Sequence, residues 1–328
     1  MIRLLWRTDI HCADKSPSFR TDNWMSTILD KLDQISTIAR DRKVDAVIDG
    51  GDIFDRKSPF LNSHMMVRSL AKSHKSYPCP IYVNVGNHDC VYSDIAYLNS
   101  QPLGVLYDTG IFQRLYDENE LLIEKDGITV RVCGVPYHGV KYDKSRLDIK
   151  KGKEDYLVVA AHLLASKTGT SMFESEDIIP YSDLEPLAPD IWCFGHWHKD
   201  QGITKLSNGG HVVNVGSLTR GSLSEDNLDR KPCVVLMEFD QTGIHIERIN
   251  LKVKTPDLCF DLARKEEEVG REVMLDDFIS ILSKSSFKID SQRDIYTVLR
   301  SNNDLTSEVR DRSIFYIEEV ERTKQRIT

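Results

Sequence analysis

The chain has 328 residues, which is enough to bury a full core as one large domain or as one domain with a small appendage. Its 40% hydrophobic and 29% charged residues are typical of globular proteins, and no run approaches the roughly 20 apolar residues of a membrane-spanning helix. The net charge of −8 argues against binding nucleic acid through a generally basic surface. It does not exclude a nuclease, because a site for divalent cations needs clustered carboxylates.

The chain start and the cysteines both favour a cytoplasmic protein. The first residues reach the acidic Asp9 after a short apolar run, which suits a first strand better than a signal peptide. The seven cysteines are scattered without a Cys-x-x-Cys pair, and several lie in apolar runs. We expect reduced, mostly buried thiols and no disulfide framework.

The first third of the chain alternates predicted strands and helices. Apolar residues recur at helical spacing in two stretches, and short apolar runs separate them. Strand, helix, strand, helix, strand predicts a parallel sheet with right-handed crossovers. The predicted strands are residues 2–7, 44–48 and 81–85, and the predicted helices are residues 22–42 and 61–73.

The pattern then becomes richer in antiparallel pairs. Residues 121–124 and 128–133 flank an Asp-Gly turn and predict a hairpin. Residues 255–328 are charged and mostly helical in pattern, so we place a domain boundary between residues 254 and 255 and expect a helical cap or partner-docking segment after it. Further strands are predicted at residues 157–161, 191–194, 212–215, 234–239 and 244–249.

Five short motifs each follow a predicted strand. Loops at the carboxyl ends of strands in an open α/β sheet converge on one crevice. Asp, His and Asn side chains are ligands suited to manganese, iron or zinc, and adjacent glycines allow sharp backbone turns. Together the motifs predict a site for two metal ions. They are Thr8-Asp9-Ile10-His11, Gly50-Gly51-Asp52, Gly86-Asn87-His88-Asp89, the lone His162, and Gly195-His196-Trp197-His198.

Each motif has a plainer interpretation when taken alone. A single Asp after a strand, such as Asp9 or Asp52, is commonly a helix or turn cap. A solitary histidine such as His162 is commonly a hydrogen-bonded structural residue. The order and number of the motifs favour the metal site. Four histidines lie outside the motifs and are interpreted as ordinary surface or sheet residues: His64, His74, His211 and His245.

The five motifs resemble those of the calcineurin-like metallophosphoesterase superfamily. Longer phrases resemble its SbcD-type DNA repair nucleases and their phage recombination counterparts, over roughly residues 1 to 250. The resemblance implies a four-layer α/β/β/α sandwich and makes residues 1–254 the nuclease domain. The phrases are Gly51-Asp52-Ile53-Phe54-Asp55, Val85-Gly86-Asn87-His88-Asp89, Gly134-Val135-Pro136-Tyr137 and Val215-Gly216-Ser217.

The resemblance also implies a role for each site residue. It implies two divalent ions, with manganese as the first choice and iron, zinc or magnesium as alternatives. Asp52 would bridge the two ions. His88 would be the catalytic acid or would steady the transition state, and Asp89 would orient it. Asp55 stands where some family members carry a DNA-contacting histidine, so no DNA role is carried over to it. The remaining ligands would be Asp9, His11 and His198 for one ion, and Asn87, His162 and His196 for the other.

The leading hypothesis from the sequence is a DNA exo/endonuclease that acts beside an SbcC-like coiled-coil ATPase. It would dimerise through residues 61–73 and 93–100. The ATPase would dock on the helical stretches at residues 276–283 and 307–320, unless these stretches pack on the sandwich itself. The alternative is a relative with a small substrate, namely a cyclic-nucleotide phosphodiesterase, a nucleotide pyrophosphatase or a phosphoprotein phosphatase. A catalytically silent scaffold is a third reading, but it predicts lost ligands, whereas all eight positions are present.

Overall fold

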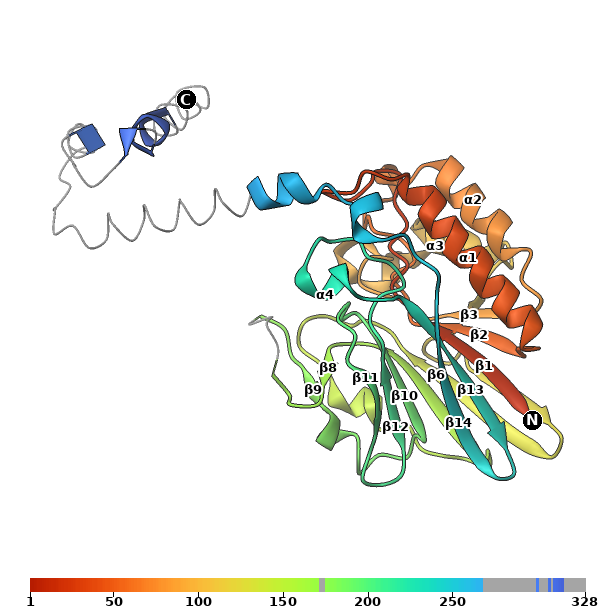
Figure 1. The fold of residues 1–328 in the computed structure, drawn as a ribbon. Coiled ribbons are helices and arrows are strands. Elements are labelled where there is room, and N and C mark those ends of the chain that lie inside the picture. The colour runs from red at the N-terminus through yellow and green to blue at the C-terminus, as the bar shows by residue number, and fades with distance from the viewer. Residues whose placement is uncertain (171–174, 268–298, 301–305, 308, 316–328) are drawn as a thin grey trace. The chain divides into compact units, whose positions relative to one another are not determined.

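The computed structural model describes residues 1–170, 175–267, 299–300, 306–307 and 309–315. The chain divides into two compact units, Met1–Lys265 and Glu266–Thr328, and the fold and site described here belong to the first. Figure 1 shows the first unit as two stacked sheets, with helices α1 and α2 on the outer side of one of them.

The first sheet has a parallel centre and an antiparallel edge. Strands β1 (Ile2–Arg7), β2 (Ala46–Asp49) and β3 (Ile81–Val83) run parallel, as the alternating pattern predicted. The strand order is β14-β13-β1-β2-β3-β4. The remaining strands are β4 (Gln113–Arg114), β13 (Cys233–Asp240) and β14 (Gly243–Asn250).

Helices α1 (Trp24–Asp41), α2 (His64–His74) and α3 (Pro102–Asp108) cover the outer face of this sheet. The predicted helix over residues 61–73 begins later, at His64, because the Ser63 hydroxyl accepts the Met66 N–H as an N-cap and residues 59–61 form a 3-10 turn. The buried stripe of α1 repeats at helical spacing, which packs that helix on the sheet. It consists of Ile28, Leu32, Ile35 and Ala39.

The second sheet has the order β11-β12-β10-β7-β6-β5. Its central strands β6, β7, β10 and β12 are parallel, and the two edge strands pair antiparallel. Asp126 and Gly127 both have positive φ, 54° and 73°, as the turn of the predicted β5–β6 hairpin requires. The bounds are β5 (Leu121–Lys125), β6 (Ile128–Val135), β7 (Tyr156–His162), β10 (Ile191–Gly195), β11 (Gly202–Lys205) and β12 (His211–Asn214).

The main core lies between the two sheets. Alternate residues of β1 and β2 face alternate residues of β6, β7 and β10, which is the packing of a sandwich. The Asn84 side chain, just after β3, donates to the carbonyls of Val135 and Ala160 at 2.9 and 3.0 Å and so ties the sheets together. Chief members of this core are Leu4, Trp6, Ile48, Val132, Val158, Ala160, Ile191 and Cys193.

The predicted sandwich fold is confirmed, and its fourth layer has an unexpected make-up. Within the described part of the chain, the outer face of the second sheet is covered without an α-helix. Short 3-10 turns at Lys144–Leu147 and Tyr181–Asp183 and the two-stranded sheet of β8 (Ala165–Ser166) and β9 (Ile179–Pro180) pack there instead. Helix α4 (Glu225–Leu228) follows β12.

Residues 255–265 still belong to the first unit. Phe260 is buried with Leu223 and Cys259, and it forms a β-bridge with Arg20. The boundary predicted between residues 254 and 255 stays a prediction. The predicted helix over residues 276–283 lies outside the described residues. Of the stretch at 307–320, the structure describes helix at residue 307 and at 309–315.

Two further expectations concern cysteines and membranes. All seven cysteines are free, in agreement with the expected thiols. In the described ranges, no helix combines the length and the apolar character that crossing a membrane requires.

Candidate metal centre

The loops after β1 and β2 are locked to one another by their backbones. The Asp9 N–H donates to the Gly51 carbonyl and the His11 N–H to the Asp52 carbonyl, both at 3.0 Å. Asp9, His11 and Asp52 all have positive φ, between 49° and 54°. Three neighbouring residues whose backbones are held in this sparsely populated left-handed region are typical of a functional site.

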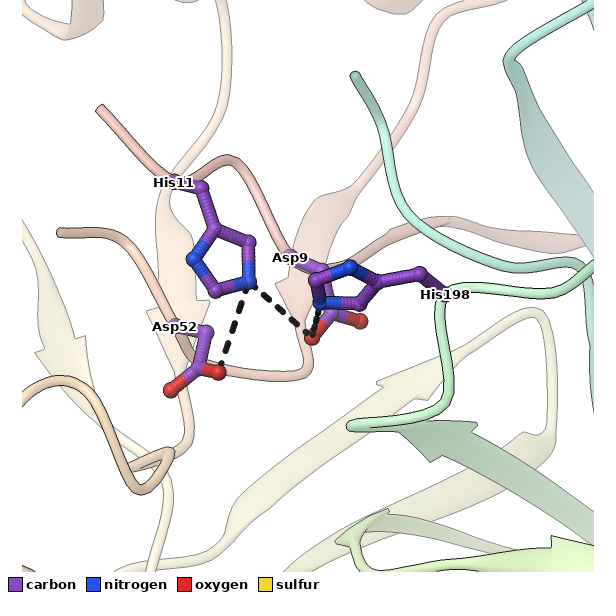
Figure 2. A group of neighbouring side chains, drawn as sticks. All are labelled: Asp9, His11, Asp52 and His198. Atoms are coloured by element: carbon purple, nitrogen blue, oxygen red, sulfur yellow. Dashed lines mark ion pairs between the residues drawn. The ribbon is translucent and has the colours of Figure 1, made fainter. Parts of the chain in front are cut away.

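One group of side chains brings Asp9, His11, Asp52 and His198 together (Figure 2). His11 Nε2 lies 3.8 Å from Asp9 Oδ1 and 3.5 Å from Asp52 Oδ2. His198 Nε2 lies 3.8 Å from the same Asp9 oxygen. These side chains lie in loops that follow strands of both sheets, and they include the three residues predicted to hold the first ion.

A second group brings Asp52, His162 and His196 together, with their ligand atoms all within 4.8 Å of one another. His162 Nε2 lies 3.3 Å from Asp52 Oδ2 and 3.2 Å from Asn87 Oδ1. His162 Nδ1 faces the Gly50 carbonyl at 2.9 Å, which assigns the ring proton to Nδ1 and leaves Nε2 toward Asp52. Asp52 thus belongs to both groups.

The chemistry of these groups fits a pair of cations. In the described part of the chain, His11 Nε2 and Asp52 Oδ2 are buried polar atoms with no hydrogen-bond partner. Such atoms are costly unless something satisfies them. Burial by itself lowers the pKa of His162, yet the Asp52 carboxylate, together with Asp9 and the Gly50 carbonyl, more than reverses this and raises it to about 9. The site therefore favours positive charge at the point where Asp52, Asn87 and His162 meet.

His88 lies beside the first group, with its ring 4.9 Å from that of His11. Its Nδ1 faces the Asp55 carbonyl at 2.7 Å, and its backbone N–H donates to Asp52 Oδ1 at the same distance. The Nδ1 contact fixes the ring and leaves Nε2 for a reacting group. The Asp55 carboxylate lies 3.7 Å from His11 Nδ1. Asp55 therefore contacts the Nδ1 atoms of both histidines, that of His88 through its carbonyl and that of His11 through its carboxylate.

Asp89 acts differently from the prediction. It was expected to orient the His88 ring, but the contact to that ring is made by Asp55. The buried Asp89 carboxylate instead accepts four backbone N–H groups at 2.8 to 3.3 Å, which explains why a carboxylate follows His88 directly: it closes the loop after β3 onto the loop after β2. The four donors are Asp52, Ile53, Phe54 and Gly86.

The pKa of Asp89 reflects this position. Burial and the neighbouring Asp52 carboxylate raise its pKa to about 7, while the N–H groups of Gly86 and Phe54 act in the opposite direction. Gly86 is required at this junction, because a Cβ there would lie 2.1 Å from Asp52 Oδ1.

The structure adds Glu176, which the sequence analysis missed. Its Oε1 lies 3.0 Å from His196 Nε2 and accepts the Tyr142 hydroxyl at 2.6 Å. A carboxylate on the outer nitrogen of a metal-binding histidine orients the ring and raises its basicity. Glu176 has no motif around it, so only the tertiary contact identifies it.

His74 was expected to be an ordinary surface or sheet histidine, and this is wrong. It lies on α2, is 3% exposed, and places Nε2 2.7 Å from Arg7 Nη2. Arg7 also donates to Asp49 Oδ2 at 2.6 Å and to the Tyr77 hydroxyl at 2.9 Å. Asp49 Oδ1 in turn accepts the Gly51 N–H at 3.1 Å, so this buried network braces the loop that carries Asp52.

Comparison with known proteins places the chain in a family. A sequence model described as calcineurin-like phosphoesterase matches residues 2–200. A DNA double-strand break repair protein Mre11 from Methanosarcina acetivorans is 23% identical over 234 residues, which cover 69% of this chain and 35% of that protein. The chain therefore aligns with about a third of the length of this relative.

Two solved structures are similar to this chain. A dimetal phosphatase from Danio rerio has a TM-score of 0.50 at 12% identity, covering 76% of this chain and 96% of that one. A purple acid phosphatase from yellow lupin (Lupinus luteus) has a TM-score of 0.47 at 16% identity, covering 76% of this chain and 51% of that one.

Proposed function

The chain belongs to the calcineurin-like phosphoesterase family, a family of metal-dependent hydrolases with two divalent ions, and we propose that it is a phosphodiesterase that cleaves DNA. The observation that carries the two-metal chemistry of this proposal is the sharing of Asp52 between two groups of ligand atoms. Its Oδ2 is buried and faces His11 at 3.5 Å on one side and His162 at 3.3 Å on the other. A carboxylate so placed suits a bridge between two ions.

The residues present suit the predicted division of ligands. Asp9, His11 and His198 would hold one ion, while Asn87, His162 and His196 would hold the other, with Asp52 common to both. Bound there, two divalent ions would polarise the phosphoryl group and activate the attacking water for in-line displacement. Manganese is the ion we propose, since imidazole, carboxylate and amide oxygen ligands suit it.

His88 would deliver the proton that the departing sugar oxygen needs. Its Nδ1 is fixed on the Asp55 carbonyl, so Nε2 is the atom that exchanges protons with substrate. Asp55 holds the ring, and the Asp89 carboxylate holds the loops after β2 and β3 together by accepting four backbone N–H groups. The chain thus supplies an acid with a fixed direction beside the ligand groups.

DNA as the substrate is supported by likeness and not by the site geometry. The relative from Methanosarcina acetivorans is named as a DNA double-strand break repair protein, and the phrases around the motifs resemble SbcD-type nucleases. We therefore propose a nuclease subunit with exo- and endonuclease activity in repair or recombination. An SbcC-like coiled-coil ATPase is the partner we propose.

A second copy of the chain is the other partner we propose. Large apolar side chains are exposed on, or directly beside, the two segments expected to dimerise, residues 61–73 and 93–100. Phe60 and Met65, beside the start of α2, are 96% and 77% exposed, and Tyr92 is 84% exposed. Burying such side chains against a partner is favourable, and a cluster of them is typical of an interaction surface.

The substrate is tested by offering the purified protein with manganese three phosphodiesters: linear duplex DNA, single-stranded DNA and bis(p-nitrophenyl) phosphate. We expect cleavage of DNA, measured as nucleotide release and strand shortening. If the small ester turns over while both DNAs stay intact, even with an SbcC-like ATPase present, the nuclease proposal fails and a small-substrate phosphoesterase takes its place.

His88→Ala tests the proposed acid. Loss of a positioned proton donor should lower kcat by roughly 10²- to 10⁴-fold. Two metal ions should still bind, as measured by metal analysis after dialysis. His245→Ala, on the edge strand β14, is the matched control and should keep activity. Loss of a metal ion from the His88 variant would show that His88 is a ligand.

A further inference from the structure

A short loop, residues 217–219, lies beside the first ligand group, and we call it the bridging loop. Along the chain it comes between β12 of the second sheet and β13 of the first, and its three residues are at most 3% exposed. The Ser217 N–H donates to the His198 carbonyl at 3.2 Å. Gly216 precedes the loop with a φ of 71°, and a Cβ there would lie 2.3 Å from the same carbonyl. The loop is thus in close contact with the backbone of a predicted metal ligand.

The bridging loop also contacts the turn that carries the other two predicted ligands of the first ion. The Leu218 N–H donates to the Thr8 carbonyl at 3.0 Å. The Thr219 hydroxyl donates to the Ile10 carbonyl at 3.4 Å. Each of these two carbonyls belongs to the residue directly before a ligand residue. The bridging loop therefore joins the ligand loop of the first sheet to the ligand loop of the second.

One buried side chain, that of Arg230, holds the bridging loop. Arg230 is 7% exposed, and its guanidinium donates to the Ser217 carbonyl at 2.5 Å and to the Ser217 hydroxyl at 3.0 Å. It also donates to the Thr219 carbonyl and, at 3.0 Å, to the Asn227 side-chain oxygen. A guanidinium presents its donors in a rigid planar fork, so these four contacts fix the course of the loop.

The second ligand group is held by different contacts. His162 Nδ1 faces the Gly50 carbonyl, and Glu176 contacts His196 Nε2. Neither contact involves Arg230 or the bridging loop. A change at Arg230 should therefore disturb the two ligand groups unequally.

We propose that Arg230 is a positioning residue for the first metal ion, because it holds the loop that joins the backbone of His198 to the turn of Asp9 and His11. The proposal rests on the two-ion site of the proposed function and adds to it a residue outside both ligand groups. Residues that orient metal ligands typically contribute about 10- to 100-fold to metal affinity. Loss of the Arg230 side chain should weaken binding of the first ion and leave the second ion bound.

Isothermal titration of the metal-free protein with manganese tests this role. The wild-type chain should bind two ions, and Arg230→Met should weaken one of them by roughly 10-fold while the other is retained. Arg230→Lys keeps the charge but lacks the fork of donors. It should show a similar loss, because all four acceptors are uncharged oxygens. Unchanged binding of both ions in Arg230→Met would overturn the inference, and so would an equal loss of both.

Two double variants identify the ion that is affected. In a His198→Ala background a ligand that Arg230 positions is already lost, so Arg230→Met should weaken manganese binding no further. Glu176→Ala acts on the second ion, so its effect and that of Arg230→Met should add. A further loss in the His198→Ala background, or losses that do not add with Glu176→Ala, would contradict the assignment to the first ion.

Arg131→Met is the matched control for loss of a hydrogen-bonded arginine. Arg131 lies on β6, where it donates to Glu154 at 2.9 Å and to Glu120 at 3.2 Å. The control should lower the melting temperature and keep both ions. An equal loss of one ion in the control would reduce the effect to general destabilisation and overturn the inference.

Thermal unfolding of each variant shows whether the fold is kept, and Arg230→Lys carries the test if Arg230→Met does not fold. A wild-type protein that binds fewer than two ions would show that the two-metal site of the proposed function has itself failed. Two ions bound equally well by the wild type and by the Arg230 variants would overturn this inference alone.

Discussion

At the scale of single residues, the site depends on a few side chains whose neighbours orient them. Asp52 faces two histidines, and its loop is held by Asp89 through three backbone N–H groups. His88 and His162 each have Nδ1 fixed by a backbone carbonyl, so their Nε2 atoms point where chemistry needs them. The site therefore depends on how these side chains are oriented as well as on which residues they are.

Glu176 gives a prediction at this scale. Its contact with His196 Nε2 would fix that ring for metal binding through the other nitrogen. Glu176→Ala should weaken manganese binding by about 10- to 100-fold, and Glu176→Gln by less because an amide oxygen can still accept the N–H. Asp183→Asn, at an exposed ion pair with Lys144, is the control. Isothermal titration with manganese measures the effect, and unchanged binding in the alanine variant would contradict this role.

At the scale of elements, one buried network joins two helices and two strands to the loop of Asp52. Arg7 on β1 contacts Asp49 on β2 and His74 on α2. Arg7 also donates to the Tyr77 hydroxyl, which in turn donates to the Leu32 carbonyl of α1. Breaking one partner would leave a buried charge without compensation, which is strongly destabilising. The helices therefore do more than cover the sheet: they fix the turn from which Asp52 projects.

The pH dependence of stability follows from His74. Burial first, and then the Arg7 charge, hold the pKa of His74 well below its usual value. The folded protein keeps this ring neutral while the unfolded chain takes up a proton below a pH of about 6.5. Because the pKa of His74 is lower in the folded protein than in the unfolded chain, folding stability is unaffected by this residue above the unfolded pKa. Stability is lost as the pH falls below that value.

Urea unfolding at pH 7.5 and pH 5.5 measures this effect. Lowering the pH from 7.5 to 5.5 should reduce the free energy of unfolding by about 1.4 kcal/mol through His74. This is the free energy of binding one proton in the unfolded chain at one pH unit below its pKa. His74→Gln has no proton to take up and should lose that much less than wild type over the same interval. Equal losses in both proteins would refute the assignment.

At the scale of the whole molecule, the site exists because two sheets meet. Asp9 and Asp52 lie in the loops after β1 and β2 of the first sheet, whereas the second sheet carries His162 at the end of β7 and His196 and His198 in the loop after β10. The core between the sheets and the Asn84 contacts set their separation. The same scale includes the exposed apolar surface beside α2, which we propose contacts a second copy of the chain.

Light scattering tests that assignment. The wild-type protein should be a dimer, and Phe60→Ser combined with Met65→Ser should shift it to a monomer, because two highly exposed apolar side chains of that surface are lost. Leu122→Ser, 64% exposed on the edge strand β5, is the matched control and should stay dimeric. A monomeric wild-type protein rules out the proposed interface.

The sequence determined most of the strands, helices α1 and α2 and the type of site, for a physical reason. Periodicity marks buried faces, and ligand residues placed after successive strands must meet at one sheet edge when the strands are parallel. The predicted ligand residues do come together on this basis. The Asp-Gly hairpin was also predictable, because Asp126 and Gly127 accept positive φ.

Tertiary structure alone decided the contacts between residues that no local pattern relates. Glu176 meets His196, the Asp55 carbonyl takes the place foreseen for Asp89 at His88, and His74 lies buried on Arg7. The fourth layer is made of 3-10 turns and a short sheet because loop packing, and not helical periodicity, covers the second sheet. Such contacts depend on distances across the fold, which a residue's own neighbours in the chain do not encode.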